Sequence, residues 1–203
     1  MTALKWILRI GIWAWLAYWI AQIFVGGLGA APALRLNHEI GEIVLILLTE
    51  NILVGIATFF FKPPPRWLRF FLQQRRFVGV SLFLMLLFHI GFYFLNEGFE
   101  GKAFWQVVTK TYLIFGFSAS LILLVMAMTS NNFSMKRLGG KRWKNLQRLV
   151  YGVQLLLFGH LLLIEKADLL KYSIWLGLLL LVQVIRWIPW VRAKKVLPKS
   201  PVV

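Results

Sequence analysis

Long apolar runs alternate with short polar segments along nearly the whole chain. Six such runs cover residues 5–26, 39–61, 77–96, 111–129, 147–165 and 172–191. A membrane-spanning helix needs about 20 mainly apolar residues, and no strand-length alternation of apolar and polar residues accompanies these runs. The pattern therefore predicts an all-α integral membrane protein, a six-helix bundle built as a single domain over residues 1–203.

Cations lie mainly in the polar segments between the runs. The sequence carries 23 Lys and Arg residues and a net charge of +16, and 18 of the 23 fall on one side of the predicted bundle. Cytoplasmic loops of membrane proteins carry such an excess, so both termini are expected in the cytoplasm. The positive charge therefore indicates orientation in a lipid bilayer and no nucleic-acid partner.

The composition restricts the kinds of metal site and covalent cross-link that the chain can form. The chain is 60% hydrophobic with a mean hydropathy of +0.74, and it contains no cysteine. The lack of thiols excludes disulfides, thiolate-bound iron-sulfur clusters and thioether-linked haem. Metal chemistry in this chain must therefore use histidine.

Two of the three histidines lie inside predicted membrane spans. His89 follows Arg76 by thirteen residues, and His160 follows Gln147 by thirteen. At 1.5 Å per residue, both imidazoles lie about 20 Å from the cytoplasmic edge, on helices that run in the same direction. A b-type haem needs two neutral imidazoles on opposite faces of its iron, so we expect these two histidines to be axial ligands. A hydrogen-bonded structural pair, a proton relay or a site for another metal remain alternatives.

Gly91 and Gly159 lie close to these histidines in the sequence. Glycine would let a bulky macrocycle approach the helix backbone, although glycine is also common in membrane helices. We therefore expect these two positions to flank the macrocycle.

The second apolar run contains Glu39, Glu42, Glu50 and Asn51. At 100° per residue, Glu39 and Glu50 differ by about 20° around a helix, and Glu42 lies about 60° to one side. Ionisable groups are rare inside bilayers, so Glu50 is a candidate for a quinol contact or a proton path. The alternative is a protonated Glu50 that is hydrogen-bonded within the bundle, with the other two carboxylates at the outer interface. His38, at the start of this run, is expected either at the surface or in contact with a haem propionate or a quinol.

Three segments carry a resemblance to a known family. They read FVGGLGAAPALRLNHEIGEIVL, RRFVGVSLFLMLLFHIGFYFL and RLGGKRWKNLQRLVYGVQLLLFGHLLL. They resemble the corresponding segments of the MsrQ (YedZ) family of haem-binding membrane subunits, which is part of the wider ferric reductase-like transmembrane family. The similarity extends from about residue 25 to residue 190.

The resemblance implies a bacterial inner-membrane bundle that carries haem b and in some members FMN. It implies electron transfer from the membrane quinone pool to a periplasmic molybdopterin subunit that reduces oxidised methionines. His89 and His160 match the family's ligand histidines, and His38 matches its histidine at the outer end of the second span. The chain is then an electron-transfer subunit of an oxidoreductase system and not its catalytic subunit.

Two positions depart from the family pattern. Gln147 stands before LVY where the family has a histidine, and Glu42 stands where the family has a cation. Relatives with two stacked haems use a second histidine pair one layer nearer the cytoplasm, where this chain offers Arg75 or Arg76 and Gln147. Glutamine is a poor iron ligand beside imidazole, so we expect one haem per chain.

The sequence shows no glycine-rich phosphate loop and no dinucleotide fingerprint, so we expect a separate electron donor, a membrane quinol. Two other functions stay open. One is a ferric reductase-like haem subunit with a different acceptor. The other is a haem-free transporter or assembly protein, although no inverted repeat or pair of broken helices favours transport.

Overall fold

The computed structural model describes residues 2–164 and 169–187, and these residues form helices without any β-strand. The ends of the fifth and sixth predicted spans, residue 165 and residues 188–191, lie outside the described residues. The helices are α1 (Thr2–Val25), α2 (Pro32–Phe60), α3 (Arg66–Asn96), α4 (Gly101–Thr109), α5 (Thr111–Met128), α6 (Asn132–Leu138), α7 (Gly140–Gln147), α8 (Val150–Leu162) and α9 (Leu169–Trp187). The predicted all-α class is confirmed.

Four of the described helices, α1, α2, α3 and α5, are long and apolar enough to cross a membrane. The apolar part of α9 is shorter and covers Leu170–Ile185, and α8 has 13 residues. The chain is therefore a multi-pass membrane protein, as predicted, whereas the number of six spans stays a prediction.

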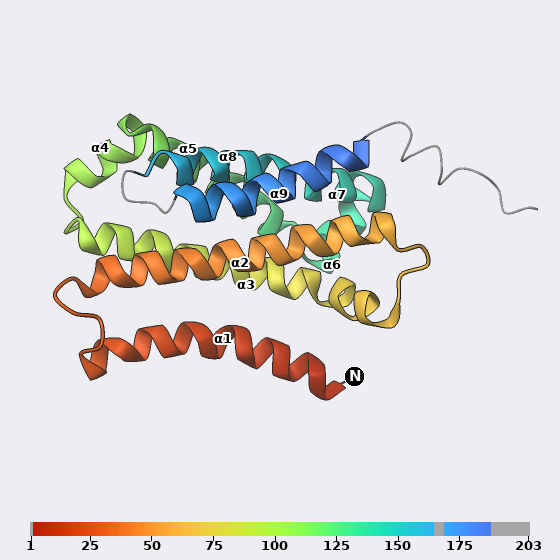
Figure 1. Cartoon of the computed structure of the whole chain (residues 1–203), viewed down its shortest axis with the longest axis horizontal. Coiled ribbons are helices and arrows are strands. Elements are labelled where there is room, and N and C mark those ends of the chain that lie inside the picture. Colours follow the sequence, from red (N-terminus) through yellow and green to blue (C-terminus); the bar gives the residue numbers. More distant parts are fainter. Residues whose placement is uncertain (1, 165–168, 188–203) are drawn as a thin grey trace, which may run out of the picture.

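The long helices lie side by side and alternate in direction (Figure 1). In chain order, α1, α2, α3, α5, α8 and α9 each run antiparallel to the one before. Helix α2 packs along α3, α5 packs along α8, and α3 contacts α5. The start of α1 and the end of α9 lie at the same end of the bundle (Figure 1). We call this end, which also contains α6 and α7, the inner end, and we call the opposite end, with α4, the outer end.

Buried apolar side chains concentrate on α2 and α3. They extend along α2 from Leu36 to Ile56 and along α3 from Leu68 to Leu86. Helices α1 and α5 bury few side chains and expose many large apolar ones, which suits helices in contact with lipid. The interior of the protein therefore lies between the α2–α3 pair and the α5–α8 pair.

Two helices begin earlier than their apolar runs. Helix α3 begins at Arg66 and not at residue 77, and α2 begins at Pro32 and not at residue 39. A hydropathy pattern ends where apolar residues end, but a helix continues while its backbone hydrogen bonds are made, and arginine is a good helix former. Arg75 and Arg76 are therefore residues of α3 and do not belong to a loop.

The predicted fifth span, residues 147–165, is divided between α7 and α8. Helix α7 ends at Gln147 and α8 begins at Val150. Between them the backbone N–H of Arg148 donates to the carbonyl of Asn145 at 3.1 Å, a tighter turn than that of an α-helix. The short helices α4, α6 and α7 were not predicted, because each has fewer than ten residues and falls wholly or largely outside the apolar runs.

Candidate functional site

His89 lies on α3 and faces α2. Its Nδ1 is 2.8 Å from the backbone carbonyl oxygen of Asn37. The side-chain Nδ2 of Asn37 donates in return to the backbone carbonyl of His89 at 2.7 Å. A Cβ atom added at Gly41, one turn further along α2, would lie 3.0 Å from Cε1 of His89. The missing side chain at Gly41 therefore provides the space that the imidazole occupies.

His160 makes the same kind of contact between α8 and α5. Its Nδ1 is 2.7 Å from the backbone carbonyl oxygen of Tyr112. A Cβ atom added at Gly116 would lie only 2.8 Å from this Nδ1. Gly116 follows Tyr112 by four residues, just as Gly41 follows Asn37. Each imidazole is thus held by a carbonyl group and packed against a glycine one turn later on the same helix.

These contacts determine which ring nitrogen is free. A carbonyl oxygen only accepts hydrogen bonds, so Nδ1 of both His89 and His160 must carry the proton. In a neutral imidazole Nε2 then carries the lone pair that binds a metal. Neither Nε2 has a hydrogen-bond partner among the described residues.

The two histidines also share a location. Asn37 and Tyr112 lie in the first two turns of α2 and α5, so both imidazoles are at the outer end. Two neutral imidazoles with free Nε2 atoms fit the ligand set of a bis-histidine haem, whereas a purely structural pair would leave both Nε2 atoms unused.

The other predicted site residues, His38 and Glu50, lie apart. His38 is exposed near the start of α2 and lies within electrostatic range of His89. Glu50 follows Asn37 by thirteen residues on α2, about 20 Å further along the helix toward the inner end. Both of its carboxyl oxygens are buried and have no hydrogen-bond partner among the described residues. No described residue supplies the hydrogen bond that the alternative interpretation expects, so both interpretations of Glu50 stay predictions, and this residue is not brought together with the histidines.

Glu39 and Glu42 form ion pairs near the outer end. Glu39 lies 2.8 Å from the guanidinium of Arg35, one turn earlier on α2. Glu42 lies 2.8 Å from Nζ of Lys171 on α9, and the hydroxyl of Tyr172 donates to it at 3.2 Å. These contacts agree with the interpretation of both carboxylates as interface residues, and α9 supplies a cation for the unexpected Glu42.

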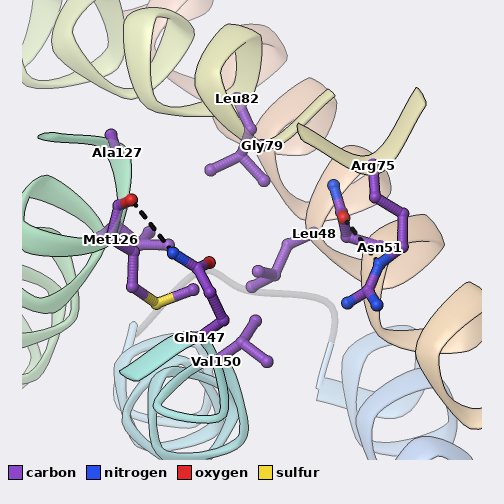
Figure 2. A pocket seen from close by; sticks show the side chains of 10 residues that line it. Leu48, Asn51, Arg75, Gly79, Leu82, Met126, Ala127, Gln147 and Val150 are labelled. Atoms are coloured by element: carbon purple, nitrogen blue, oxygen red, sulfur yellow. Dashed lines mark hydrogen bonds between the residues drawn. The ribbon is translucent and has the colours of Figure 1, made fainter. Parts of the chain in front are cut away.

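The contact of Asn37 with His89 has a counterpart closer to the inner end. Asn51 follows Asn37 by fourteen residues on α2, and Arg75 precedes His89 by fourteen on α3. Fourteen residues make almost four helical turns, so both pairs lie on the same helix faces, about 21 Å apart. Nε of Arg75 donates to Oδ1 of Asn51 at 3.4 Å (Figure 2). Arg75, and not Arg76, therefore occupies the place that corresponds to His89.

The glycine next to His89 is repeated as well. Gly55 follows Gly41 by fourteen residues, and a Cβ atom added there would lie 3.3 Å from Nη2 of Arg75. The side chain of Arg75 thus packs on Gly55 as His89 packs on Gly41.

Helix α5 and the α7–α8 segment show a similar repeat. Met126 follows Tyr112 by fourteen residues, and Gln147 precedes His160 by thirteen. Nε2 of Gln147 donates to the backbone carbonyl of Met126 at 3.3 Å (Figure 2). We call Asn37, His89, Tyr112 and His160 the outer layer, and Asn51, Arg75, Met126 and Gln147 the inner layer. The inner layer repeats the outer layer with arginine and glutamine in the histidine positions.

The glycines that contact the imidazoles are not the two expected to flank a macrocycle, Gly91 and Gly159, whose role stays a prediction. A Cβ atom added at Gly91 would meet nothing within 4 Å, and one added at Gly159 would meet the ring of Phe115 at 2.8 Å. The glycines that contact the imidazoles are Gly41 and Gly116. The signal that could have found the first of them is the spacing Asn-x-x-x-Gly, which occurs twice in residues 32–60.

Comparison with known proteins agrees with this geometry. The family described as ferric reductase like transmembrane component matches residues 40–158. The chain is 37% identical to the "Protein-methionine-sulfoxide reductase heme-binding subunit MsrQ" of Rhodospirillum rubrum, over 87% of this chain and 84% of that protein. It is 32% identical to the protein of the same name in Caulobacter vibrioides, over 81% and 76%. No solved structure matches the chain. The chain therefore belongs to the MsrQ family of ferric reductase-like transmembrane proteins.

Proposed function

We propose that the chain is a haem b electron-transfer subunit of a bacterial inner membrane. It takes electrons from membrane quinol and passes them to a periplasmic methionine sulfoxide reductase subunit of the molybdopterin type. The names of its relatives, heme-binding subunits of protein-methionine-sulfoxide reductase, support this proposal. The observation that carries it is the pair of outer-layer imidazoles whose Nδ1 atoms are bound to carbonyl groups and whose Nε2 atoms have no hydrogen-bond partner within residues 2–164 and 169–187.

His89 and His160 would hold the iron through their Nε2 atoms. When bound, the haem supplies a one-electron carrier that alternates between ferric and ferrous iron. The backbone carbonyls of Asn37 and Tyr112 orient the two rings and increase the basicity of Nε2. The hydrogen bonds from His89 and His160 to these carbonyl groups thus set both the geometry of the site and its affinity for iron.

The outer location of this pair suits delivery of electrons to the periplasm. His38 is exposed at the same end, and we propose that it contacts a haem propionate. FMN remains a further candidate cofactor, for which the cations of the inner end would provide phosphate ligands. One haem per chain is expected, because the inner layer contains no histidine.

The direct test is an absorption spectrum of the purified full-length protein with haem quantification. We expect about one haem per chain with a Soret band, and a loss of at least tenfold in His89→Ala and in His160→Ala. Asn96→Ala, an exposed substitution on the same helix as His89, is the control and should retain the haem. A wild-type protein that binds no haem would leave the histidines as a structural pair.

The electron acceptor needs a separate test. Quinol and the purified periplasmic reductase subunit are mixed with the protein in lipid. The measurement follows the loss of a methionine sulfoxide substrate. Turnover that needs all three components supports the proposal. Reduction of a ferric chelate without turnover of methionine sulfoxide would favour the ferric reductase-like alternative.

A further inference from the structure

The inner layer contains buried polar atoms without partners. Asn51 is only 9% exposed, and its Nδ2 has no hydrogen-bond partner among the described residues. The carboxyl oxygens of its neighbour Glu50 are also buried and unpartnered, and Glu50 interacts with Arg75 only through longer-range electrostatics. Buried polar groups are stable when something hydrogen-bonds them. These atoms therefore indicate a ligand that the chain itself does not supply.

A cavity of about 60 Å³ adjoins Asn51, whereas Glu50 does not line it. Asn51 and Arg75 line it from α2 and α3, and Met126 and Gln147 line it from the opposite side (Figure 2). Aliphatic side chains form the walls between the two sides: Leu48, Leu82, Leu123 and Val150. The cavity thus has polar groups at two opposite edges and an apolar surface between them.

The polar groups on both sides are hydrogen-bond donors. Asn51 offers its unpartnered Nδ2, and the guanidinium of Arg75 offers further N–H groups. On the other side Gln147 makes only long bonds, 3.3 Å to the carbonyl of Met126 and 3.5 Å to Oγ of Ser130. Side chains held by such long bonds can turn toward a better acceptor. The matching ligand is a flat apolar ring with a carbonyl oxygen at each of two opposite edges.

We propose that the inner layer binds the head group of a membrane quinone, with Asn51 and Arg75 at one carbonyl oxygen and Gln147 at the other. A quinone has this chemistry and dissolves in the bilayer that surrounds the helices. A bis-histidine haem, in contrast, needs two imidazoles, and the inner layer contains no histidine. The inference rests on the proposed function, in which quinol is the donor, and adds the location and the contacting residues.

The test uses full-length protein in lipid nanodiscs and a photoreactive azido-benzoquinone. Saturable labelling that a natural quinone displaces is expected on α2, on α3 and around the junction of α7 and α8. Asn51→Leu and Gln147→Leu should each weaken the apparent affinity at least tenfold. Gly79→Leu should abolish binding, because a Cβ atom at Gly79 has room, 4.0 Å from Nδ2 of Asn51, and a longer side chain would fill the cavity.

A matched control tests whether loss of a buried amide alone explains these effects. Gln154 is fully buried on α8, its Nε2 is unpartnered among the described residues, and it does not line the cavity. Gln154→Leu should keep the wild-type quinone affinity. Equal loss of affinity in this control would overturn the proposal.

Haem content is measured on every sample to separate this inference from the proposed function. Normal haem content without saturable quinone labelling overturns the quinone site alone. Quinone labelling that depends on Asn51 and Gln147 in a protein without haem supports the site and overturns the proposed electron carrier. Displacement of the label by FMN and not by quinone would assign the cavity to flavin and overturn the inference.

Discussion

Short hydrogen bonds hold both imidazoles of the outer layer, whereas the inner layer has long bonds and unpartnered atoms. Nδ1 of His89 and of His160 lie 2.8 and 2.7 Å from their carbonyl partners. The corresponding bonds of Arg75 and Gln147 measure 3.4 and 3.3 Å. Both layers use α2, α3 and α5, and His160 on α8 corresponds to Gln147 at the end of α7. On α2 and α3 the difference therefore comes from the side chains and not from the backbone.

The outer layer is a preorganised site, whereas the side chains of the inner layer can adapt to a ligand. In the outer layer, the hydrogen bond at Nδ1 and the adjoining glycine leave each ring little freedom, which suits a metal ligand. In the inner layer, flexible arginine and glutamine side chains surround a small cavity, which suits reversible binding of an organic ring. In the proposed function, the outer layer holds the electron carrier and the inner layer binds the electron donor.

The strongest test of this comparison converts one layer into the other. Arg75→His combined with Gln147→His should raise the haem content from about one to about two per chain, because it places imidazoles where the outer layer has His89 and His160. Haem quantification per chain is the measurement. Arg76→His with Gln147→His is the control, since Arg76 faces Ser130 and Asn132 and should give no second haem. An unchanged haem content in the first variant would mean that the layers are not equivalent.

A second test disturbs the tighter of the two histidine contacts. Gly116→Ala should reduce haem occupancy by more than half, because the new Cβ atom would lie 2.8 Å from Nδ1 of His160 and must displace the ring. The Soret absorbance per chain measures this effect. Gly152→Ala, where a Cβ atom meets nothing within 4 Å, should retain full occupancy. Equal occupancy in both variants would show that the ring tolerates the displacement.

A third test compares equivalent glycines of the two layers. Gly41→Ala should lower haem occupancy by about a third to a half, since the Cβ atom would lie 3.0 Å from the rigid ring of His89. Gly55→Ala should change it little, because its Cβ atom would lie 3.3 Å from the flexible end of Arg75. Occupancy is again measured by Soret absorbance. Similar losses of haem occupancy in the two variants would show that the two layers do not differ in rigidity.

The smallest expected effect concerns the asparagines of the two layers. Asn37→Leu should lower the free energy of unfolding by about 1 kcal/mol, because it removes the 2.7 Å bond to the carbonyl of His89. Asn51→Leu should lower it by less, since it removes a 3.4 Å bond together with an unpartnered buried amide. Unfolding in mixed micelles measures both values. A larger loss in Asn51→Leu would mean that the inner layer is the better satisfied one.

The pattern of apolar runs was sufficient to predict the all-α membrane fold and the long helices, because about 20 apolar residues have few alternatives in a bilayer. It did not predict where α2 and α3 begin, because polar and charged residues extend each helix beyond the point where its apolar run starts. The division between α7 and α8 was not predicted either, because the residues of that turn include no proline or glycine.

The sequence alone determined that two histidines lie at matched depth and that Gln147 departs from the family, because the rise along a helix converts residue number into depth. Only the tertiary structure decided which side chains meet. It chose Arg75 over Arg76, placed Gly41 and Gly116 against the imidazoles, and separated Glu50 from them. Such choices depend on how neighbouring helices are rotated against each other, and side-chain packing between helices sets that rotation, which no single helix encodes.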